Sequence, residues 1–199
     1  MINIDKISNK KHYKIFKEFY RLALENNQDI IEAISISSFD KSSQEVESRF
    51  VNLKYIIDEE WIFFSNYLSP KSKQFDGHNQ IAATIFWNSI NVQIRMKAFI
   101  RKTNLNFSDK HFHSRDKKKN ALAISSNQSN KINSYKDVKQ KYKDVLTKDD
   151  NLHTRPSYWG GFSFNPYYFE FWQGNKNRLN KREVFELKNG DWLNYKLEP

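Results

Sequence analysis

The spacing of apolar residues changes along the chain after about residue 27. From about Lys11 to Asn27, aromatic and aliphatic residues recur every three or four positions, which predicts an amphipathic helix that ends near Asn26. The following segments are short runs of β-branched and aromatic residues divided by polar breaks, a pattern typical of strands. The predicted strands are Ile30 to Phe39, Arg49 to Ile57, Trp61 to Asn66, Ile81 to Trp87 and Val92 to Arg101.

The clearest strand pattern is Val92 to Ile100, where Gln93, Arg95 and Lys97 alternate with apolar residues. Side chains of a strand point alternately to its two faces, so one face of this strand is expected in the core. Helices are expected next, and then strands return. These later elements are a helix from Ser108, as N-cap, to about Asn120, a helix from Tyr135 to Leu146, strands Phe162 to Trp172 and Arg182 to Leu187, an Asn189-Gly190 turn, and a strand around Trp192 to Leu197.

Composition narrows the fold class that this pattern indicates. The 199 residues are enough for one well-cored domain, and no break in composition indicates a second. Hydrophobic residues make up 38% of the chain and aromatic residues 16%, so the core is expected to depend on Phe, Tyr and Trp, which suit sheet surfaces. The fold class predicted is therefore α+β and rich in β-structure.

The net charge of +10 raises the question of a nucleic-acid partner. The lysines are scattered along the chain and form no single stripe, which argues against nucleic acid. The absence of cysteine excludes disulfides, thiolate metal sites and a cysteine nucleophile, and no metal-ligand cluster, Gly-rich phosphate loop or dinucleotide fingerprint is present. Because no stretch approaches ~20 apolar residues, we expect no membrane span and a soluble, cytoplasmic protein.

The C-terminal part of the chain carries the densest candidate chemistry. Two tryptophans, a Gly-Gly step and spaced arginines fall in Arg155 to Phe162, Phe169 to Gly174 and Arg178 to Arg182. If the last segment is extended, Arg178, Asn180 and Arg182 share one face. Such a wall suits a flat anionic ligand, and the alternative is a solvated edge strand whose arginines serve solubility.

Two other constellations indicate phosphate binding. His111, Arg115 and Lys119 recur every four residues in the predicted helix, so they form a cationic row that can clamp a phosphate or, alternatively, an exposed basic face. The second is the cationic strand from Arg49 to Lys54. It is followed by Phe64-Ser65-Asn66 and then Lys71, which together offer the cations and hydroxyl groups that a phosphate monoester requires.

These motifs, taken in order, carry a resemblance. They are Arg49-x-Val-x-Leu-Lys54, Phe63-Phe64-Ser65-Asn66, Gln93, Phe112-His113-Ser114-Arg115, Gln128-Ser129, Trp159-Gly-Gly-Phe162 through Arg182, and the terminal Leu197-Glu-Pro199. In order and spacing from about Arg49 to Pro199, the chain resembles the pyridoxamine 5'-phosphate oxidase family. The segment Asp40 to Ser48 matches poorly.

The resemblance implies an FMN-binding split β-barrel with flanking helices, formed by residues 1–199 as one domain, with the N-terminal helix at about 11–27 and the barrel and helices at about 30–199. It also implies a homodimer that holds FMN at the subunit interface. The positions implied to contact FMN are Arg49, Lys54, Phe64, Ser65, Lys71, Gln93, Gln128, Ser129, Trp172 and Arg182. The positions implied to contact substrate are Lys54, His111, Arg115, Lys119, Arg178 and Asn180, the last two also as the catalytic pair.

The activity implied is oxidation of pyridoxamine or pyridoxine 5'-phosphate by FMN and dioxygen, giving pyridoxal 5'-phosphate and hydrogen peroxide. The chain departs from the family at Pro70, where the family has arginine, and at His111, Lys119 and Asn180, where it has tyrosine, serine and histidine. An amide cannot take up a proton as imidazole can. Two alternatives stay open for this reason: an FMN-dependent oxidase of another anionic substrate, as in phenazine biosynthesis, and a non-catalytic protein that binds flavin or pyridoxal phosphate.

Overall fold

The computed structural model describes residues 1–148 and 151–199. The elements are β1 (Asn3–Ile7), α1 (Lys11–Glu25), β2 (Ala33–Asp40), β3 (Glu45–Asp58), β4 (Glu60–Asn66), α2 (Pro70–Gly77), β5 (Gln80–Trp87), the 3₁₀ turn η1 (Asn88–Ile90), β6 (Val92–Lys102), α3 (Leu105–Ser114), α4 (Lys117–Ser125), α5 (Tyr135–Lys148), β7 (Trp159–Gln173), β8 (Lys181–Lys188) and β9 (Asp191–Leu197).

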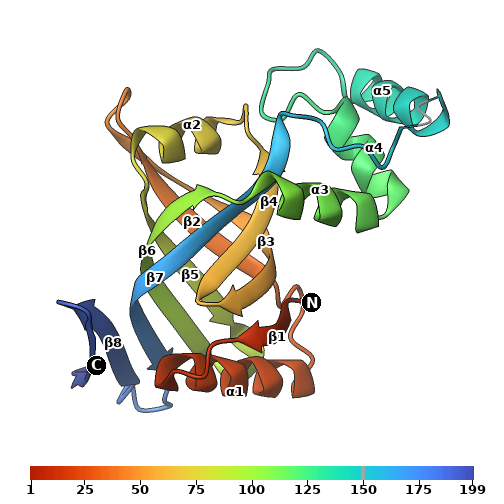
Figure 1. Cartoon of the computed structure of the whole chain (residues 1–199). Helices are drawn as coiled ribbons and strands as arrows, with labels where there is room; N and C mark the ends of the chain where they lie inside the picture. Colours follow the sequence, from red (N-terminus) through yellow and green to blue (C-terminus); the bar gives the residue numbers. More distant parts are fainter. Residues whose placement is uncertain (149–150) are drawn as a thin grey trace.

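The strands close into a ring. The hydrogen-bonded order runs β3, β2, β5, β6, β7 and β4, and β4 pairs back with β3. β1 adds to the outside of β3 in parallel, and β8 and β9 continue from β7 as an antiparallel extension. Figure 1 shows this ring with α1 across one end and α2 to α5 gathered toward the other. β7 is the longest strand, and it pairs with β4, β6 and β8.

Aromatic side chains fill the ring, as the composition predicts. Trp61, Phe63, Phe162, Phe164 and Phe169 are all less than 2% exposed. The Trp61 and Phe164 rings stack with centroids 6.0 Å apart, and Phe63 stacks on Phe162 at 5.6 Å. Aromatic pairs of this kind stabilise a core beyond the area that they bury. The core therefore lies inside the ring, and the sites of interest lie on its rim.

Helix α1 covers the open end of the ring with the apolar face that its sequence predicts. Tyr13 and Phe16 are fully buried, and the Phe16 ring lies edge-on to Trp61 with centroids 4.7 Å apart. The helix ends at Glu25 with Asn26 as C-cap, close to the predicted end. Leu24, an apolar residue of the same helix, is 39% exposed.

Each of the predicted strands is confirmed, with shifted ends. β3 begins at Glu45, so much of the segment from Asp40 to Ser48 is strand, and only 41–44 form the turn. The Asn189-Gly190 turn is confirmed, with φ values of 53° and 92°, where glycine is favoured. The sequence prediction missed β1, which is short, and α2, which the Ser69 N-cap and Pro70 at its first turn could have indicated.

The predicted helix from Ser108 to Asn120 is wrong as one continuous element. α3 begins earlier, with Asn104 as N-cap, and ends at Ser114. Arg115 is extended (φ −74°, ψ 155°), and the carboxylate of Asp116 then caps α4 by accepting hydrogen bonds from the backbone of Lys118 and Lys119. Aspartate favours the N-cap position, so a new helix begins at this point and the row of cations is broken.

The extended conformation considered for Arg178 to Arg182 is also wrong at its start. Arg178 has a φ of 59° and lies in the turn that precedes β8, which begins only at Lys181. The Asn180 side chain accepts a hydrogen bond from the backbone N–H of Asn175 at 3.0 Å, which closes that turn. Strand alternation therefore does not apply to Arg178 and Asn180, and only Arg182 has the predicted strand geometry.

No helix within residues 1–148 and 151–199 is both long and apolar enough to cross a membrane. The same residues contain no group of three or more His, Cys, Asp or Glu side chains that could hold a metal ion.

Candidate functional site

A cavity of about 490 Å³ opens on the rim of the ring beside β3, β4 and the first turn of α2. Its lining includes six residues that the sequence predicts for cofactor contact. They are Arg49, Phe64, Ser65, Lys71, Gln128 and Ser129. The sheet positions Arg49, Phe64 and Ser65, α2 supplies Lys71, and the loop after α4 supplies the last two. Segments far apart in the sequence thus meet at one hollow.

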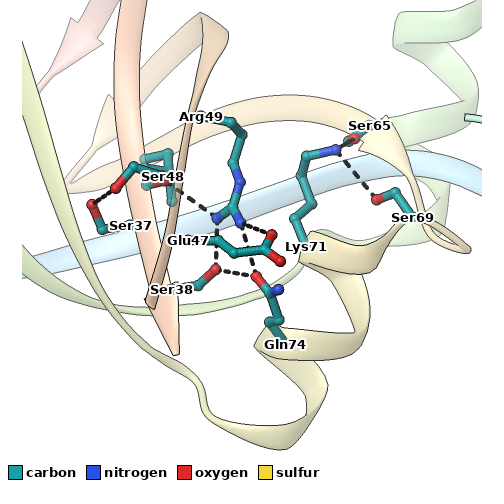
Figure 2. A network of polar contacts seen from close by, with 10 residues as sticks. Ser37, Ser38, Glu47, Ser48, Arg49, Ser65, Ser69, Lys71 and Gln74 are labelled. Atoms are coloured by element: carbon teal, nitrogen blue, oxygen red, sulfur yellow. Dashed lines mark hydrogen bonds and ion pairs between the residues drawn. The ribbon is translucent and has the colours of Figure 1, made fainter. Parts of the chain in front are cut away.

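Arg49 is held in place by a polar network that Figure 2 shows. Its guanidinium donates to Ser38 Oγ at 2.6 Å, to Gln74 Oε1 at 2.9 Å and to the Ile36 carbonyl oxygen at 3.3 Å. A further N–H donates to Glu47 Oε2 at 2.9 Å. Because a guanidinium has five donors in a rigid fork, neighbours on β2 and α2 fix its plane relative to the cavity.

Lys71 is a buried cation, and no carboxylate within residues 1–148 and 151–199 is in hydrogen-bond contact with it. Its side chain is 8% exposed, and its ammonium donates to Ser65 Oγ and Ser69 Oγ, both at 3.3 Å. Burial lowers the pKa of Lys71, the charge of Arg49 lowers it further, and Glu47 opposes both. A buried ammonium beside a guanidinium is stabilised by an anion that satisfies both cations.

The loop after α4 brings amide and hydroxyl groups to the same hollow. Gln128 Oε1 accepts from the backbone N–H of Asn66 at 3.3 Å and lies 3.5 Å from Ser65 Oγ. Ser129 has a φ of 70°, a left-handed conformation that is uncommon for serine. These contacts fix the loop on the end of β4, beside the two cations.

Aromatic rings form the neighbouring wall. The His111 ring lies parallel to Phe64, with centroids 3.7 Å apart and an interplanar angle of 9°, and the Phe64 and Trp159 rings are also parallel at 5.2 Å. The Tyr55 hydroxyl is 2.8 Å from His111 Nδ1. Burial lowers the pKa of His111 to about 4, and the charges of Arg115 and Lys54 add to that effect. His111 is therefore neutral at pH 7.

Arg115 reaches the same wall because the chain is extended there. Its guanidinium lies 4.5 Å from the centroid of Trp159 and donates to Asn120 Oδ1 at 3.3 Å. Lys54 lies on β3, where its ammonium is 3.7 Å from Glu32 Oε1, and its charge acts on His111. Lys119, in contrast, is exposed on α4. Of the predicted cationic row, His111 and Arg115 come together and Lys119 does not join them.

A second group of predicted residues lies elsewhere on the sheet. Gln93, Trp172 and Arg182 are neighbours across β6, β7 and β8, near the end of β7, whereas Phe64 pairs with Gly161 near its start. None of these three lines the 490 Å³ cavity. Asn180 and Arg182 instead line a hollow of about 360 Å³ against α1. Arg178 lies in the exposed turn that precedes β8.

The sequence interpretation missed several residues that hold the predicted ones. Glu170 is 2% exposed, and its carboxylate accepts from Arg182 at 2.8 Å, Arg95 at 3.0 Å and the Tyr168 hydroxyl at 3.1 Å. Alternation on β7 places Glu170 and Trp172 on one face, which was an available signal. The same rule on β3 places Glu47 beside Arg49. Tyr55 and Gln74 gave no comparable signal, because their contacts join different elements.

The Gly-Gly step after Trp159 has a packing explanation. A Cβ on Gly160 would lie 2.1 Å from the Tyr67 hydroxyl oxygen, and one on Gly161 would lie 2.5 Å from Thr103 Oγ1. A side chain at either position would force Tyr67 or Thr103 to shift. The two glycines therefore let β7 pack closely beside β4 and the end of β6, and they do not themselves indicate a ligand.

Known proteins share the sequence pattern of this chain. The chain is 35% identical over 195 residues to pyridoxine/pyridoxamine 5'-phosphate oxidase of Colwellia psychrerythraea, covering 96% of this chain and 88% of that protein. The chain belongs to the pyridoxine/pyridoxamine 5'-phosphate oxidase family. A relative in Hydrogenovibrio crunogenus, pyridoxine/pyridoxamine 5'-phosphate oxidase 1, is 34% identical over 187 residues, covering 92% and 86%. Residues 159–199 match the pyridoxine 5'-phosphate oxidase C-terminal dimerisation region.

Solved structures support the fold of this oxidase family. PhzG of Burkholderia lata, in complex with tetrahydrophenazine-1-carboxylic acid, superposes with a TM-score of 0.87 at 21% identity, covering 94% of this chain and 91% of that one. A pyridoxamine 5'-phosphate oxidase-related, FMN-binding protein of Nostoc punctiforme superposes with a TM-score of 0.76 at 9% identity, covering 92% and 97%. The α+β split-barrel fold predicted from the sequence is confirmed.

Proposed function

We propose that this chain is an FMN-dependent oxidase of pyridoxamine and pyridoxine 5'-phosphate. The observation that carries the proposal is the cavity where Arg49 and Lys71 meet, in a chain whose relatives at 35% and 34% identity bear that activity in their names. The products are pyridoxal 5'-phosphate and hydrogen peroxide, and dioxygen is the second substrate.

The residues of the cavity fit FMN. The phosphate of FMN is a dianion, and Lys71 is a buried ammonium whose described partners are two hydroxyl groups, beside a guanidinium that Ser38 and Gln74 hold in place. Charge-assisted hydrogen bonds from both cations would neutralise the phosphate. Ser65 and Ser129 add hydroxyl donors at the same cavity. The chemistry of this donor set is that of a phosphate monoester site.

Two polar residues of the group formed by Gln93, Trp172 and Arg182 suit contact with the flavin ring. Gln93 offers an amide donor and acceptor, and Arg182 offers a fixed positive charge beside Trp172. FMN, when bound, supplies the electron acceptor for oxidation of the substrate's exocyclic carbon and passes the electrons on to dioxygen. A cation near the ring favours its reduced, anionic form. The contribution of the chain is therefore positioning and electrostatics.

The aromatic wall is proposed as the place of the substrate phosphate. Lys54 and Arg115 provide the charge, and neutral His111 can donate one hydrogen bond because Tyr55 engages its other ring nitrogen. Arg178 and Asn180 are proposed as the residues that cover the substrate ring. Lys119 is proposed to contribute through its charge alone, since its side chain is exposed on α4.

The separation of the two groups along β7 supports a homodimer as part of the proposal. The candidate phosphate residues lie near one end of β7 and Trp172 and Arg182 lie near the other, so one chain does not enclose a whole ligand with both. Residues 159–199 match a family dimerisation region, and they contain Trp172, Arg178, Asn180 and Arg182. We therefore propose two equivalent sites, each built from both subunits.

The decisive experiment uses the purified protein and its absorption spectrum. We expect a yellow protein whose flavin band bleaches on anaerobic addition of pyridoxamine 5'-phosphate and returns with air, with release of peroxide. A protein that takes up no FMN would refute the proposal. Sedimentation at micromolar concentration checks the dimer, and a monomer that binds FMN would refute the shared site.

A second function rests on the departures near the substrate. His111, Lys119 and Asn180 stand where the family has tyrosine, serine and histidine, so another anionic substrate, of the kind bound to PhzG, is the alternative. Asn180→His separates the two functions. If this variant gains pyridoxamine phosphate oxidation that the parent lacks, the chain serves the other substrate. Flavin that is bound but reduced by no amine would instead indicate a non-catalytic binding protein.

Two further properties belong to the proposal. Residues 1–199 are proposed to form a single domain, for which we expect one cooperative unfolding transition by circular dichroism and tryptophan fluorescence. A cytoplasmic location is tested by cell fractionation. Nucleic acid is not proposed as a partner, and unspecific DNA should leave the protein's sedimentation unchanged at physiological salt, where screening weakens unspecific attraction.

A further inference from the structure

The cavity that holds Arg49 and Lys71 also contains a carboxylate. Glu47 lies two residues before Arg49 on β3, so both side chains point to the same face of the strand. Glu47 Oε2 is 2.9 Å from a terminal nitrogen of Arg49, and both residues line the cavity. Figure 2 shows the carboxylate beside the guanidinium, on the side toward Lys71. A negative group thus occupies part of the surface proposed for a phosphate.

We propose that Glu47 is an internal anion that competes with the ligand phosphate for Arg49 and thereby limits the preference of the cavity for phosphorylated over unphosphorylated flavin. This inference rests on the proposed function. The inference adds to the proposed function a residue that determines specificity. This residue lies in the segment Asp40 to Ser48, which matches the family pattern poorly.

The charges of the cavity support competition. Among the described lining residues, the cations are Arg49 and Lys71, and the carboxylate is Glu47. The cavity therefore carries a net charge of about +1 for a dianionic phosphate, where the cations alone would supply about +2. The negative charge of Glu47 also acts on Lys71. It raises the pKa of Lys71, whereas burial and the charge of Arg49 lower that pKa. Glu47 thus faces both cations that a phosphate needs.

The geometry also separates Glu47 from the positioning of Arg49. The guanidinium is held by Ser38, Gln74 and the Ile36 carbonyl without Glu47. The Glu47 side chain is 50% exposed, and among the described residues its carboxylate is hydrogen-bonded only to Arg49. Removal of its charge should therefore leave the fold and the guanidinium plane unchanged. What it changes is the repulsion that an incoming phosphate meets.

The test compares two ligands that differ only in the phosphate. Flavin-free protein is titrated with FMN and with riboflavin, and quenching of flavin fluorescence gives Kd for each. Glu47→Gln keeps the shape of the side chain and its contact with Arg49 but removes the charge. We expect this variant to bind FMN about fivefold more tightly, the order of effect for a partly exposed charge, with riboflavin affinity unchanged.

Glu45→Gln is the matched control, because Glu45 is an exposed carboxylate two residues earlier on the same strand and does not line the cavity. It should change neither Kd. Equal or weaker FMN binding by Glu47→Gln, or an equal gain for riboflavin, would overturn the inference while leaving the proposed function intact, provided that the parent binds FMN. A parent that binds neither flavin would overturn both.

Discussion

The imidazole of His111 and the ring of Phe64 lie face to face, 3.7 Å apart and 9° from parallel, although 47 positions (111 − 64) separate them in the chain. The contact joins α3 to β4, and it places a titratable ring against an apolar surface where the charges of Arg115 and Lys54 also act on it. Both surroundings disfavour a charged imidazole. The neutral state of His111 is thus a product of the tertiary structure.

The first prediction concerns the titration of His111. Because its pKa is lowered to about 4, the ring should remain neutral down to about pH 5, whereas an exposed histidine titrates near pH 6.5. NMR of the ¹⁵N-labelled ring should show this midpoint. Inorganic phosphate bound beside the ring should raise it, since an anion favours imidazolium. A midpoint near 6.5 in the free protein would contradict the proposed environment.

The second prediction concerns stability in acid and a different histidine. His12 is 1% exposed among Tyr13, Phe169 and Trp192, and burial, with a smaller effect of Lys10, lowers its pKa to about 4. The unfolded chain binds the proton near pH 6.5, so the stability that this group contributes is complete above that pH and is lost as pH falls toward 4.

His12→Phe tests this directly. The unfolding free energy of the parent should fall between pH 7 and pH 5. Its Tm should therefore drop by several degrees, since a loss of about 1 kcal/mol lowers Tm by roughly 2–4 °C in a chain of this size. The variant should lose less over the same interval, because phenylalanine binds no proton. Differential scanning calorimetry at the two pH values gives both numbers, and identical pH slopes would contradict the account. His78→Phe is the control, because His78 is only half-buried.

The third prediction concerns the buried cation of the cavity. Lys71→Met removes the ammonium but keeps the apolar stem, so FMN should bind about 10- to 100-fold more weakly, the range for one charge-assisted hydrogen bond. The variant should be at least as stable as the parent, because an unpaired buried charge is gone. Lys73→Met, on the exposed side of the same helix, should change neither property. FMN titration and urea unfolding measure both.

The fourth prediction concerns Glu170, which joins two arginines beneath the C-terminal strands. Glu170 is 2% exposed, but Arg182 and Arg95 are 25% and 49% exposed, so Glu170→Gln should cost about 1–3 kcal/mol of unfolding free energy, the range for lost hydrogen bonds to a charged group. Urea denaturation should show a loss of that order. The exposed carboxylate of Glu18, which pairs with Arg21, is the comparison, and Glu18→Gln should have little effect. Equal effects would show that Glu170 is not the buried anchor.

The fifth prediction concerns the close packing of β7. Gly161→Ala would place a Cβ 2.5 Å from Thr103 Oγ1, and overpacking of this kind costs about 1–3 kcal/mol. Adding Thr103→Ala should recover much of that loss, because the two nearest crowding atoms, Thr103 Oγ1 and Cγ2, are then gone. Gly77→Ala, which meets no atom within 4 Å, should be neutral or stabilise by about 0.4–1 kcal/mol. Urea unfolding of the three variants distinguishes them.

The sequence by itself determined the elements whose signal is local. The alternation in Val92 to Ile100 predicts β6, the helical period after Lys11 predicts α1, and Asn189-Gly190 predicts the last hairpin, because strand, helix and turn preferences act over a few residues. The family resemblance was also present in the sequence, since it depends on the order of motifs and not on their contacts.

Only the tertiary structure decided how the candidate residues group. The capping of α4 by Asp116 turns Arg115 onto Trp159 and leaves Lys119 apart, which periodicity alone did not predict. The turn before β8 removes Arg178 from the strand face that it was expected to share with Arg182. Contacts between distant segments depend on how strands and helices pack, and no local pattern encodes that packing.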